Sequence, residues 1–442
     1  MQQPANQARI RVEASLTPRR LHRYPTGIVF ASCAGIFLLG LFVRLAFVTL
    51  RPGLGTEEPV NIAVSIAATG RYADAYGPGV GPTAHAAPLH PLMLSALLKL
   101  FGTGIGGVRA ISVLASTESS LAFALLPALA VASGFGLGCG VLAGLGGALL
   151  PVNFWHQTNG SFEAPLTALL LVTLCILLSR TWAARSFTIS QAAIFGFVAG
   201  AACLTSPVVI PVLVAWSVAS VLRFRDDFQR VIVFFAVAAG LVLVMLAPWA
   251  VRNHRALGAF IWTRSDFGIE LQVSNNDLMT ADLERNVALP EFALFHPHVG
   301  EHERARVKAM GEVAYSNAKL HEALAWIASH PDRFASLTAQ RIRLFWMPRM
   351  VRWWQTVLEA ALSFGALIGL ALLFWRRSDS AWILGAAVVM YPPVYYLIQA
   401  APRYRLPLES ILYLLAARAL TFLFERKVPR LDRAVSSGSA QH

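Results

Sequence analysis

The sequence has few charged residues for its length of 442 residues. Charged residues make up 14% of the chain, whereas a soluble domain carries about a quarter. Only 24 residues are acidic, against 37 lysines and arginines, and 56% of all residues are hydrophobic. This shortage of charge excludes an ordinary soluble domain and favours a protein that lies largely within a membrane, where charged side chains are costly.

Cysteine is also scarce. The chain has four cysteines, and all of them fall within apolar runs: Cys33, Cys139, Cys175 and Cys203. Their spacing fits neither a disulfide framework nor a metal site. We therefore expect them to be small buried hydrophobic residues.

Long apolar segments dominate the sequence. Crossing a bilayer takes roughly 20 apolar residues, and hydropathy predicts an all-α polytopic membrane protein with about ten transmembrane helices: 28–50, 109–132, 135–151, 161–178, 187–205, 207–222, 229–249, 354–375, 381–400 and 406–424. The apolar run 88–101 is shorter, and we expect it to be interfacial or re-entrant. The first span has no cleavage site after it and is predicted to be a retained anchor.

The net charge of +13 could indicate a nucleic-acid partner, but its distribution argues against one. The arginines cluster in the two tails and in short loops between spans, which is typical of cytoplasmic ends. This pattern predicts basic cytoplasmic tails (1–27 and 425–442) and a transmembrane core (28–250) that includes an acidic first external loop (51–108). An external, mainly helical segment (251–353) and the last three transmembrane helices (354–424) follow.

Helical spacing from Val307 to Ile327 predicts one helix in the external segment. The motif Ser329-His330-Pro331-Asp332 predicts a capping box that starts a second helix.

The first external loop opens with two adjacent carboxylates, Glu57 and Glu58. Such residues often begin a helix, where they favour the helix dipole. A carboxylate at a membrane surface can also act as a general base on a substrate held in the membrane. Arg44 lies inside the first span, and we expect it to pair with these carboxylates because an intramembrane charge is costly.

Other polar residues fall on the same predicted side of the membrane. Arginines can bind phosphate oxygens through two hydrogen bonds, and a carboxylate can activate a hydroxyl. The candidate site residues are Glu57, Glu58 and Glu163 for catalysis and His85, His90, Arg252, Arg403, Tyr404 and Arg405 for substrate binding. His296 and His298 resemble a pair of metal ligands, but without an identifiable third ligand we expect no metal site there.

Several motifs, in order, resemble the polytopic C-type glycosyltransferases that use polyprenyl-phosphate sugars. This superfamily includes protein O-mannosyltransferases and lipid A aminoarabinose transferases. The resemblance rests on the Glu57-Glu58 pair, Gly70-Arg71-Tyr72, Glu163, Pro248-Trp249 and Arg403-Tyr404-Arg405. Two departures stand out. Glu57 replaces the commoner aspartate, and Ala87-Pro88 replaces the Lys-Pro of the aminoarabinose transferases, so His85, Arg252 or Arg405 would supply that charge.

The resemblance implies an inverting, metal-independent transfer of a sugar to a hydroxyl acceptor, which can be a lipid, a glycan or a protein. It implies a multi-pass protein of the bacterial inner membrane whose site faces the periplasm. Glu57 would be the general base, Glu163 would position a substrate, and Arg252, Arg403 and Arg405 would bind the donor phosphate. No cofactor is expected besides the donor, although a divalent metal stays open. Two alternatives stay open as well: a flippase or transporter of lipid-linked sugars, and an inactive relative that acts as an assembly partner.

Overall fold

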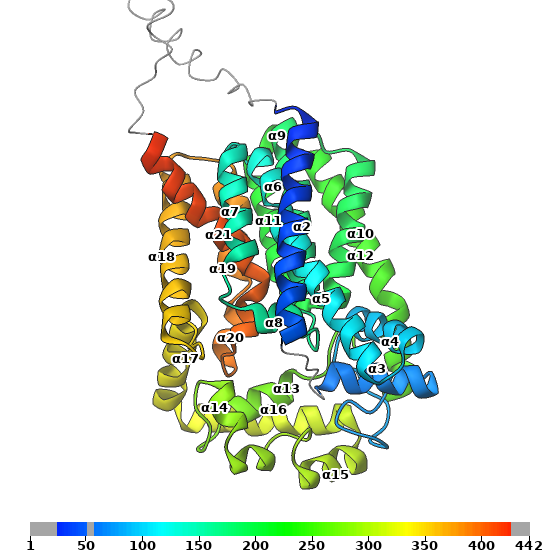
Figure 1. The fold of residues 1–442 in the computed structure, drawn as a ribbon. Coiled ribbons are helices and arrows are strands. Elements are labelled where there is room, and N and C mark those ends of the chain that lie inside the picture. Colours follow the sequence, from blue (N-terminus) through cyan, green and yellow to red (C-terminus); the bar gives the residue numbers. More distant parts are fainter. Residues whose placement is uncertain (1–23, 51–56, 426–442) are drawn as a thin grey trace, which may run out of the picture.

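The computed structural model describes residues 24–50 and 57–425, which form a bundle of helices with a helical cap at one end (Figure 1). Extended pairing within these residues is limited to two isolated bridges, Ala73 with Pro82 and Asp282 with Ala400. The α-helices are α2 (Thr26–Leu50), α3 (Glu58–Thr69), α4 (Leu89–Phe101), α5 (Ile105–Ala124), α6 (Leu126–Ala132), α7 (Leu137–Leu149), α8 (Phe154–Thr158), α9 (Ala164–Ala184), α10 (Ile189–Thr205), α11 (Ile210–Arg223), α12 (Phe228–Leu257), α13 (Phe267–Ser274), α14 (Leu283–Val287), α15 (Glu301–Met310), α16 (Glu312–Ser329), α17 (Pro331–Trp346), α18 (Trp353–Trp375), α19 (Ser380–Met390), α20 (Pro393–Leu397) and α21 (Pro402–Glu425). Short 3₁₀ turns are η2 (Pro207–Val209), η3 (Arg225–Asp227) and η4 (Pro290–Leu294).

Every apolar segment that the sequence predicted to span the membrane is helical, and the all-α polytopic fold is confirmed. Seven helical stretches are long and apolar enough to cross a bilayer: Thr26–Thr49, Ile105–Ala132, Ala164–Ala184, Arg225–Leu257, Trp353–Trp375, Ser380–Leu397 and Pro402–Phe424. The other three predicted spans correspond to the shorter helices α7, α10 and α11.

Small residues allow neighbouring helices of the bundle to approach closely. Gly196 of α10 lies so near α12 that a Cβ atom there would come within 2.7 Å of the Ala238 Cα atom. Gly369 of α18 faces the Leu415 carbonyl of α21 in the same way. Such contacts hold membrane helices together by packing, since lipid provides no hydrophobic driving force between them.

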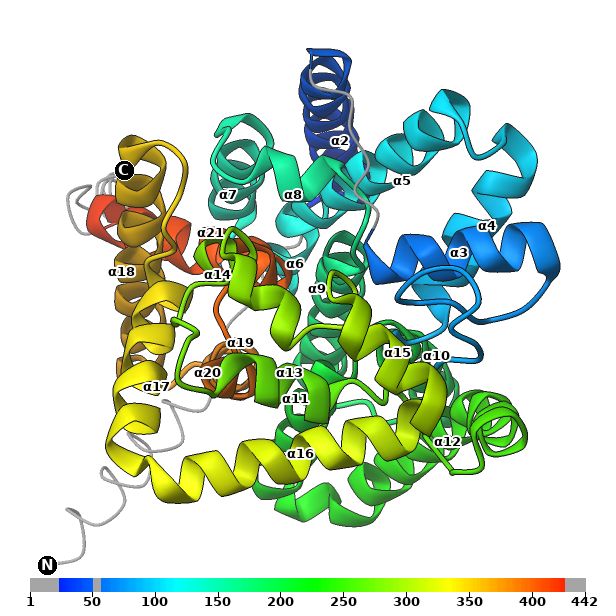
Figure 2. The same ribbon diagram turned by 90° about the horizontal axis from the view of Figure 1, so that it is seen from below.

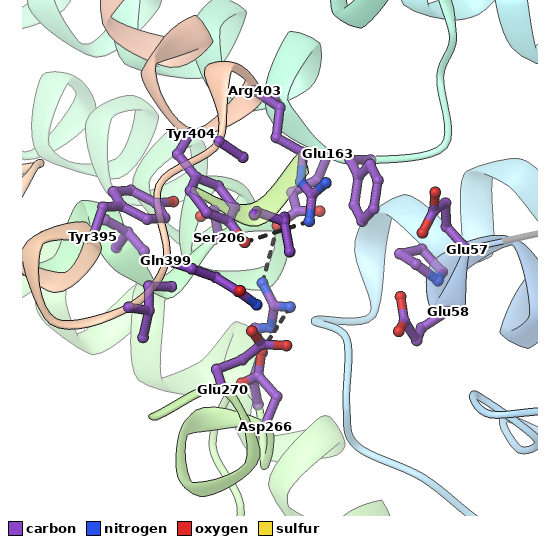
Figure 3. A pocket seen from close by; sticks show the side chains of 18 of the residues that line it. Glu57, Glu58, Glu163, Ser206, Asp266, Glu270, Tyr395, Gln399, Arg403 and Tyr404 are labelled. Carbon is purple, nitrogen blue, oxygen red and sulfur yellow. Dashed lines mark hydrogen bonds and ion pairs between the residues drawn. The ribbon is translucent and has the colours of Figure 1, made fainter. Parts of the chain in front are cut away.

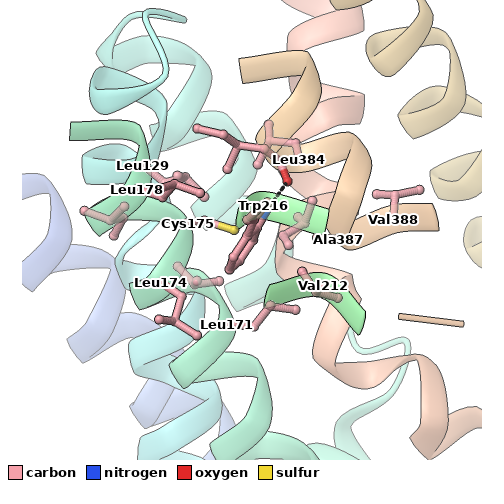
Figure 4. Close-up of a cluster of buried hydrophobic side chains, with 14 of the residues drawn as sticks. Leu129, Leu171, Leu174, Cys175, Leu178, Val212, Trp216, Leu384, Ala387 and Val388 are labelled. Atoms are coloured by element: carbon pink, nitrogen blue, oxygen red, sulfur yellow. Dashed lines mark hydrogen bonds between the residues drawn. The ribbon is translucent and has the colours of Figure 1, made fainter. Parts of the chain in front are cut away.

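The centre of the bundle is a cluster of buried side chains around Trp216 of α11 (Figure 4). Leucines of α6 and α9 surround the indole, together with Leu384 of α19. The Trp216 Nε1 atom donates a hydrogen bond to the Ile383 carbonyl at 2.8 Å, so the buried polar atom is satisfied. This cluster ties the first half of the chain to the last three spans.

The cap contains α3, α4 and the helices from α13 to α17, of which α16 runs beside α13 (Figure 2). Glu312 of α16 joins the loop between α3 and α4 to the segment between α12 and α13. Its carboxylate accepts hydrogen bonds from the Thr83 hydroxyl, from the Ala84 N–H at 2.7 Å and from the Ser265 hydroxyl at 2.5 Å. The run 88–101 forms α4, a 13-residue helix that packs on α3.

Three local predictions were wrong. The helix expected from Val307 to Ile327 is broken at Gly311, whose φ of +79° favours glycine, so α15 and α16 are separate. The predicted second helix, α17, does begin at Pro331, but Ser329 does not cap it, because the Ser329 hydroxyl bonds the Ala325 carbonyl at 2.9 Å within α16. Arg44 does not pair with the Glu57-Glu58 carboxylates. It donates to the Gln157 Oε1 atom at 2.6 Å and to the Gly147 carbonyl at 2.9 Å.

Candidate functional site

A cavity of about 650 Å³ lies between the cap and the bundle (Figure 3). Its wall combines charged groups from distant parts of the chain with apolar residues of η2, α20 and the cap. The charged and histidine side chains that line it are Glu57, Glu58, His85, His156, Glu163, Arg264, Asp266, Glu270, Glu284, His296, His298 and Arg403. The cavity thus has the size and the mixed wall of a small-molecule site.

Glu57 and Glu58 begin α3, as the helix-start interpretation predicted, but they have different surroundings. Glu57 is the N-cap residue in extended conformation, and its side chain makes no capping hydrogen bond. Among residues 24–50 and 57–425, its carboxylate has no hydrogen-bond or ion-pair partner. Glu58 is buried beside two histidines. Glu57 is therefore the carboxylate of this pair that is available to a substrate.

Glu58 shares His296 with Glu270. The His296 Nε2 atom lies 3.7 Å from the Glu58 Oε1 atom and 3.8 Å from the Glu270 Oε1 atom, and His298 Nδ1 lies 3.8 Å from Glu58. Burial alone would raise the pKa of Glu58, but His296, His85 and His298 lower it to about 2. Burial would lower the pKa of His296, but Glu270 and Glu58 raise it. The group is thus a network in which His296 stabilises the ionised form of both Glu58 and Glu270.

Arg264 joins two sides of the cavity. Its Nη1 atom lies 3.0 Å from Glu163 Oε1 at the start of α9, and its Nη2 atom lies 2.8 Å from Asp266 Oδ2. Its Nε–H donates to the His85 carbonyl at 3.1 Å. Burial alone would lower the pKa of Arg264, but Asp266 and Glu163 raise it above its ordinary value. Arg264 therefore stays charged and fixes the position of Glu163.

Arg403 enters the cavity from the start of α21. Its guanidinium carbon lies 3.9 Å from the centre of the Phe162 ring, and its Nη2 atom donates to the Tyr404 hydroxyl at 3.3 Å. Nearby, burial and the Arg403 charge lower the pKa of His156 to about 3, so that histidine is neutral. Arg403 is thus a cation held by aromatic rings, a setting in which the N–H groups that do not bond Tyr404 can bind an anion.

The structure brings six of the nine predicted site residues to the cavity wall: Glu57, Glu58, His85, Glu163, Arg403 and Tyr404. The other three, His90, Arg252 and Arg405, lie outside it. His90 is buried and bonds the Gly160 carbonyl at 3.2 Å. Arg252 donates to the carbonyls of Tyr72 and Thr83, which fastens the first loop to α12. Arg405 forms a buried ion pair with Glu359, with an N···O distance of 2.9 Å.

Three residues of the cavity could hold a metal ion. One ligand atom from each of His85, Asp266 and Glu270 lies within 4.8 Å of the others. A hydrogen bond of 2.8 Å between the Tyr76 hydroxyl and His85 Nδ1 fixes the imidazole and leaves its Nε2 atom as the ligand. The two carboxylates already have cationic partners, because Arg264 pairs with Asp266 and His296 lies beside Glu270.

The sequence interpretation missed Arg264, Asp266 and Glu270. A weak signal existed, since Arg264 and Asp266 are oppositely charged and stand two residues apart just before a short helix. It considered His296 and His298 only as a metal pair, whereas in the structure both rings lie within 4 Å of the Glu58 carboxylate. Nothing in the local sequence links Arg264 to His85, 179 residues earlier, or His296 to Glu58.

No family model matches the sequence, and a search of curated proteins finds no match. Solved structures of the Archaeoglobus fulgidus oligosaccharyltransferase are similar to it. The apo form has a TM-score of 0.55 at 14% identity over 93% of this chain and 52% of the other. The complex with an inhibitory peptide and a dolichol-phosphate has a TM-score of 0.56 at 14% identity, with the same two shares. The complex with Zn and sulfate has 0.54 at 15% identity over 89% and 49%. This chain spans about half the length of those proteins, and over that part it shares their fold.

Proposed function

We propose that this protein is a membrane glycosyltransferase that moves a sugar from a polyprenyl-phosphate carrier to a hydroxyl acceptor. The reaction takes place on the cap side of the membrane. The arginine-rich loops lie at the other end of the bundle (Figure 1), so the positive-inside rule supports an exterior position for the cap. We propose that this exterior is the periplasm of a bacterial inner membrane. The fold supports the proposed transfer of a sugar. One structural neighbour was solved with a dolichol-phosphate and another with a tethered acceptor peptide.

The observation that carries the proposal is the position of Glu57 and Arg403 at the junction of two cavities. Both residues line the large cavity, and both line an adjoining pocket of about 130 Å³ formed with Trp155, Asn159 and Gly160. A donor in the large cavity and an acceptor entering through the small pocket would meet beside them. A base and a cation at the meeting point are what a displacement at a sugar phosphate requires.

The chemistry is a single displacement. Glu57 accepts the proton of the acceptor hydroxyl while that oxygen forms a bond to the anomeric carbon. The bond between the anomeric carbon and the phosphate oxygen breaks, and polyprenyl phosphate leaves with the bonding electrons. Arg403 stabilises the negative charge that develops on the phosphate. Because one displacement occurs, the configuration at the anomeric carbon inverts.

Other residues of the cavity wall would contact the sugar and the isoprene units of the donor. Glu163, held by Arg264, positions the sugar or the acceptor through hydrogen bonds to hydroxyl groups. The apolar side of the cavity includes Pro207, Val208, Val394 and Ile398, which would contact the first isoprene units of the carrier. Tyr404 and His85 complete the wall next to the charged groups.

The test compares surface glycolipids, glycans and glycoproteins by mass spectrometry in cells that carry wild type or Glu57→Gln at matched membrane levels. Loss of a general base lowers the rate by about 10²–10⁴-fold, so one defined sugar should disappear from its acceptor. Glu301→Gln is the matched control, because Glu301 is an exposed glutamate of α15 outside the cavity. An unchanged profile with Glu57→Gln would overturn the assignment of the base. Movement of a lipid-linked sugar across vesicles without a new glycosidic bond would favour a flippase.

A further inference from the structure

A second cavity, of about 760 Å³, lies at the end of the bundle opposite the cap. It is referred to here as the distal pocket. Its wall comes from the α6–α7 loop (133–136), the α18–α19 loop (376–379), and side chains of α9 and α21. Both loops lie at the end of the molecule away from α13–α16 (Figure 1). The distal pocket shares no residue with the proposed catalytic site.

The distal pocket is positively charged. Arg376, Arg377 and Arg418 line it, and Asp379 is the single acidic residue among the lining residues. The Asp379 charge is already balanced, because its Oδ1 atom lies 2.6 Å from the Nε atom of Arg223 on α11. Three guanidinium groups around one cavity favour an anionic ligand, and their planar N–H groups match phosphate oxygens.

Two buried hydroxyl groups at the distal pocket point to the same kind of ligand. The residues Ser133 and Ser179 are 8% and 3% exposed, and both line the pocket. Within the described part of the chain, neither Oγ atom has a hydrogen-bond partner. An unpaired buried hydroxyl costs free energy, and a phosphate oxygen in the pocket could accept a hydrogen bond from such a group.

The surroundings of the pocket indicate that this anion belongs to a lipid. Arg376 packs on the ring of Phe422, with its guanidinium carbon 4.3 Å from the ring centre, and the Trp375 and Phe422 rings are 6.4 Å apart. Large apolar side chains beside these residues are exposed, with Trp375 at 67% and Phe424 at 67%. Exposed tryptophan at the end of a membrane helix is typical of the lipid–water interface. A lipid bound here would have its charged headgroup near the arginines and its acyl chains beside these exposed apolar side chains.

We propose that the distal pocket binds the phosphate headgroup of an anionic phospholipid from the membrane leaflet at the arginine-rich end. Basic pockets between transmembrane helices on the cytoplasmic side suit such headgroups. The arginines would bind the phosphate oxygens, the Ser133 and Ser179 hydroxyls would donate hydrogen bonds, and the acyl chains would lie along α18 and α21. This inference is independent of the sugar-transfer reaction.

The experiment is native mass spectrometry of the purified full chain in detergent, titrated with phosphatidylglycerol or with phosphatidylcholine. The test variant is Arg376→Ala/Arg377→Ala, which changes two exposed loop residues. The control is Arg225→Ala/Arg230→Ala, which removes the same charge from exposed positions of the same end, outside the pocket. We expect phosphatidylglycerol to bind the wild type and the control, and to bind the test variant about tenfold more weakly.

Other results would overturn the proposal. Equal weakening in the two arginine variants would show general attraction to basic loops rather than a pocket. Equal binding of phosphatidylcholine would exclude an anionic lipid. Inorganic phosphate, added at the same concentration as phosphatidylglycerol, distinguishes a lipid headgroup from a soluble phosphate as the ligand. If inorganic phosphate displaces the lipid, the pocket binds a soluble anion. Ser133→Ala/Ser179→Ala should also weaken phosphatidylglycerol binding, without a change in net charge.

Discussion

Arg264 and Glu163 are 101 residues apart in the sequence and form an ion pair of 3.0 Å across the proposed catalytic cavity. The same guanidinium pairs with Asp266 at 2.8 Å. One side chain between α12 and α13 therefore holds a carboxylate at the start of α9 in place. Its planar fork reaches both acids, which a lysine could not do with the same geometry.

Replacement of Arg264 should impair both folding and activity. Arg264→Ala leaves two part-buried carboxylates without their cation, and we expect the free energy of unfolding to fall by about 3 kcal/mol. Arg264→Lys should lose less stability, yet its product formation should still fall at least tenfold, because Glu163 would no longer be oriented. Thermal unfolding in detergent and product yield per folded molecule measure the two effects. Arg343→Ala, at an exposed position of α17, should change neither.

The network of Glu58 and His296 should make stability depend on pH. The folded pKa of Glu58, about 2, lies below its ordinary 4.5, so its contribution is complete above about pH 4.5 and is lost as pH falls toward 2. The pKa of His296 is raised above 6.5, so its contribution is complete below about pH 6.5 and is lost as pH rises through the folded value. The melting temperature should therefore be highest between about pH 4.5 and 6.5.

A substitution at His296 distinguishes the effect of this network on the melting temperature from the effect of other titrating groups. His296→Gln should flatten the decline in melting temperature on the alkaline side, whereas His321→Gln, at an exposed site of α16, should leave the profile unchanged. An unaltered alkaline decline in His296→Gln would assign the pH dependence to another group.

Arg405 should matter for stability rather than for donor binding. It is buried with Glu359, each side chain being 1% exposed, and its Nη1 atom also donates to the Trp346 carbonyl at 3.1 Å. Arg405→Ala leaves a buried charge unpaired and should cost about 3–5 kcal/mol. The double variant Arg405→Met/Glu359→Leu should recover most of that loss. If the double variant folds but has a strongly raised KM for the donor, Arg405 binds the phosphate after all.

Chelation of divalent metals should leave the transfer intact. Asp266 and Glu270, which could form a metal site with His85, are already balanced by Arg264 and His296, so the cavity does not need a metal ion to offset their charge. We expect product formation after EDTA treatment to stay within about twofold of the untreated value, a change of less than 0.5 kcal/mol in the barrier. Loss of activity that Mg²⁺ or Mn²⁺ restores would instead assign a catalytic metal to His85, Asp266 and Glu270.

The features that depend on hydropathy and local charge could be predicted from the sequence. Apolar runs located the helices of the bundle, and the run 88–101 is a helix, α4, whose position at the membrane surface stays a prediction. The acidic start of the first loop pointed to Glu57 and Glu58 because those residues are adjacent in the chain. Arg403 and Glu163, which line the cavity, could be proposed because they stand at the ends of predicted spans.

The partners of these residues could not be predicted in the same way. Whether an arginine faces a cavity or a buried glutamate depends on tertiary packing, so Arg405 and Arg403, two residues apart, have different surroundings. The fold of the segment between α12 and α18 depends on contacts such as Glu312 with Ala84, which join parts of the chain 228 residues apart. Neither periodicity nor composition contains that information.

The shared position of His296 between Glu58 and Glu270 has a consequence for how this sequence can change over time. A mutation that removes the charge of Glu58 leaves His296 with one carboxylate, and a mutation at His296 leaves two buried acids facing each other. Each substitution is harmful alone and becomes tolerable only with a compensating change far along the gene. In homologous sequences, substitutions in the first loop should therefore occur together with substitutions around residue 296. These two regions would evolve together although they lie far apart in the chain.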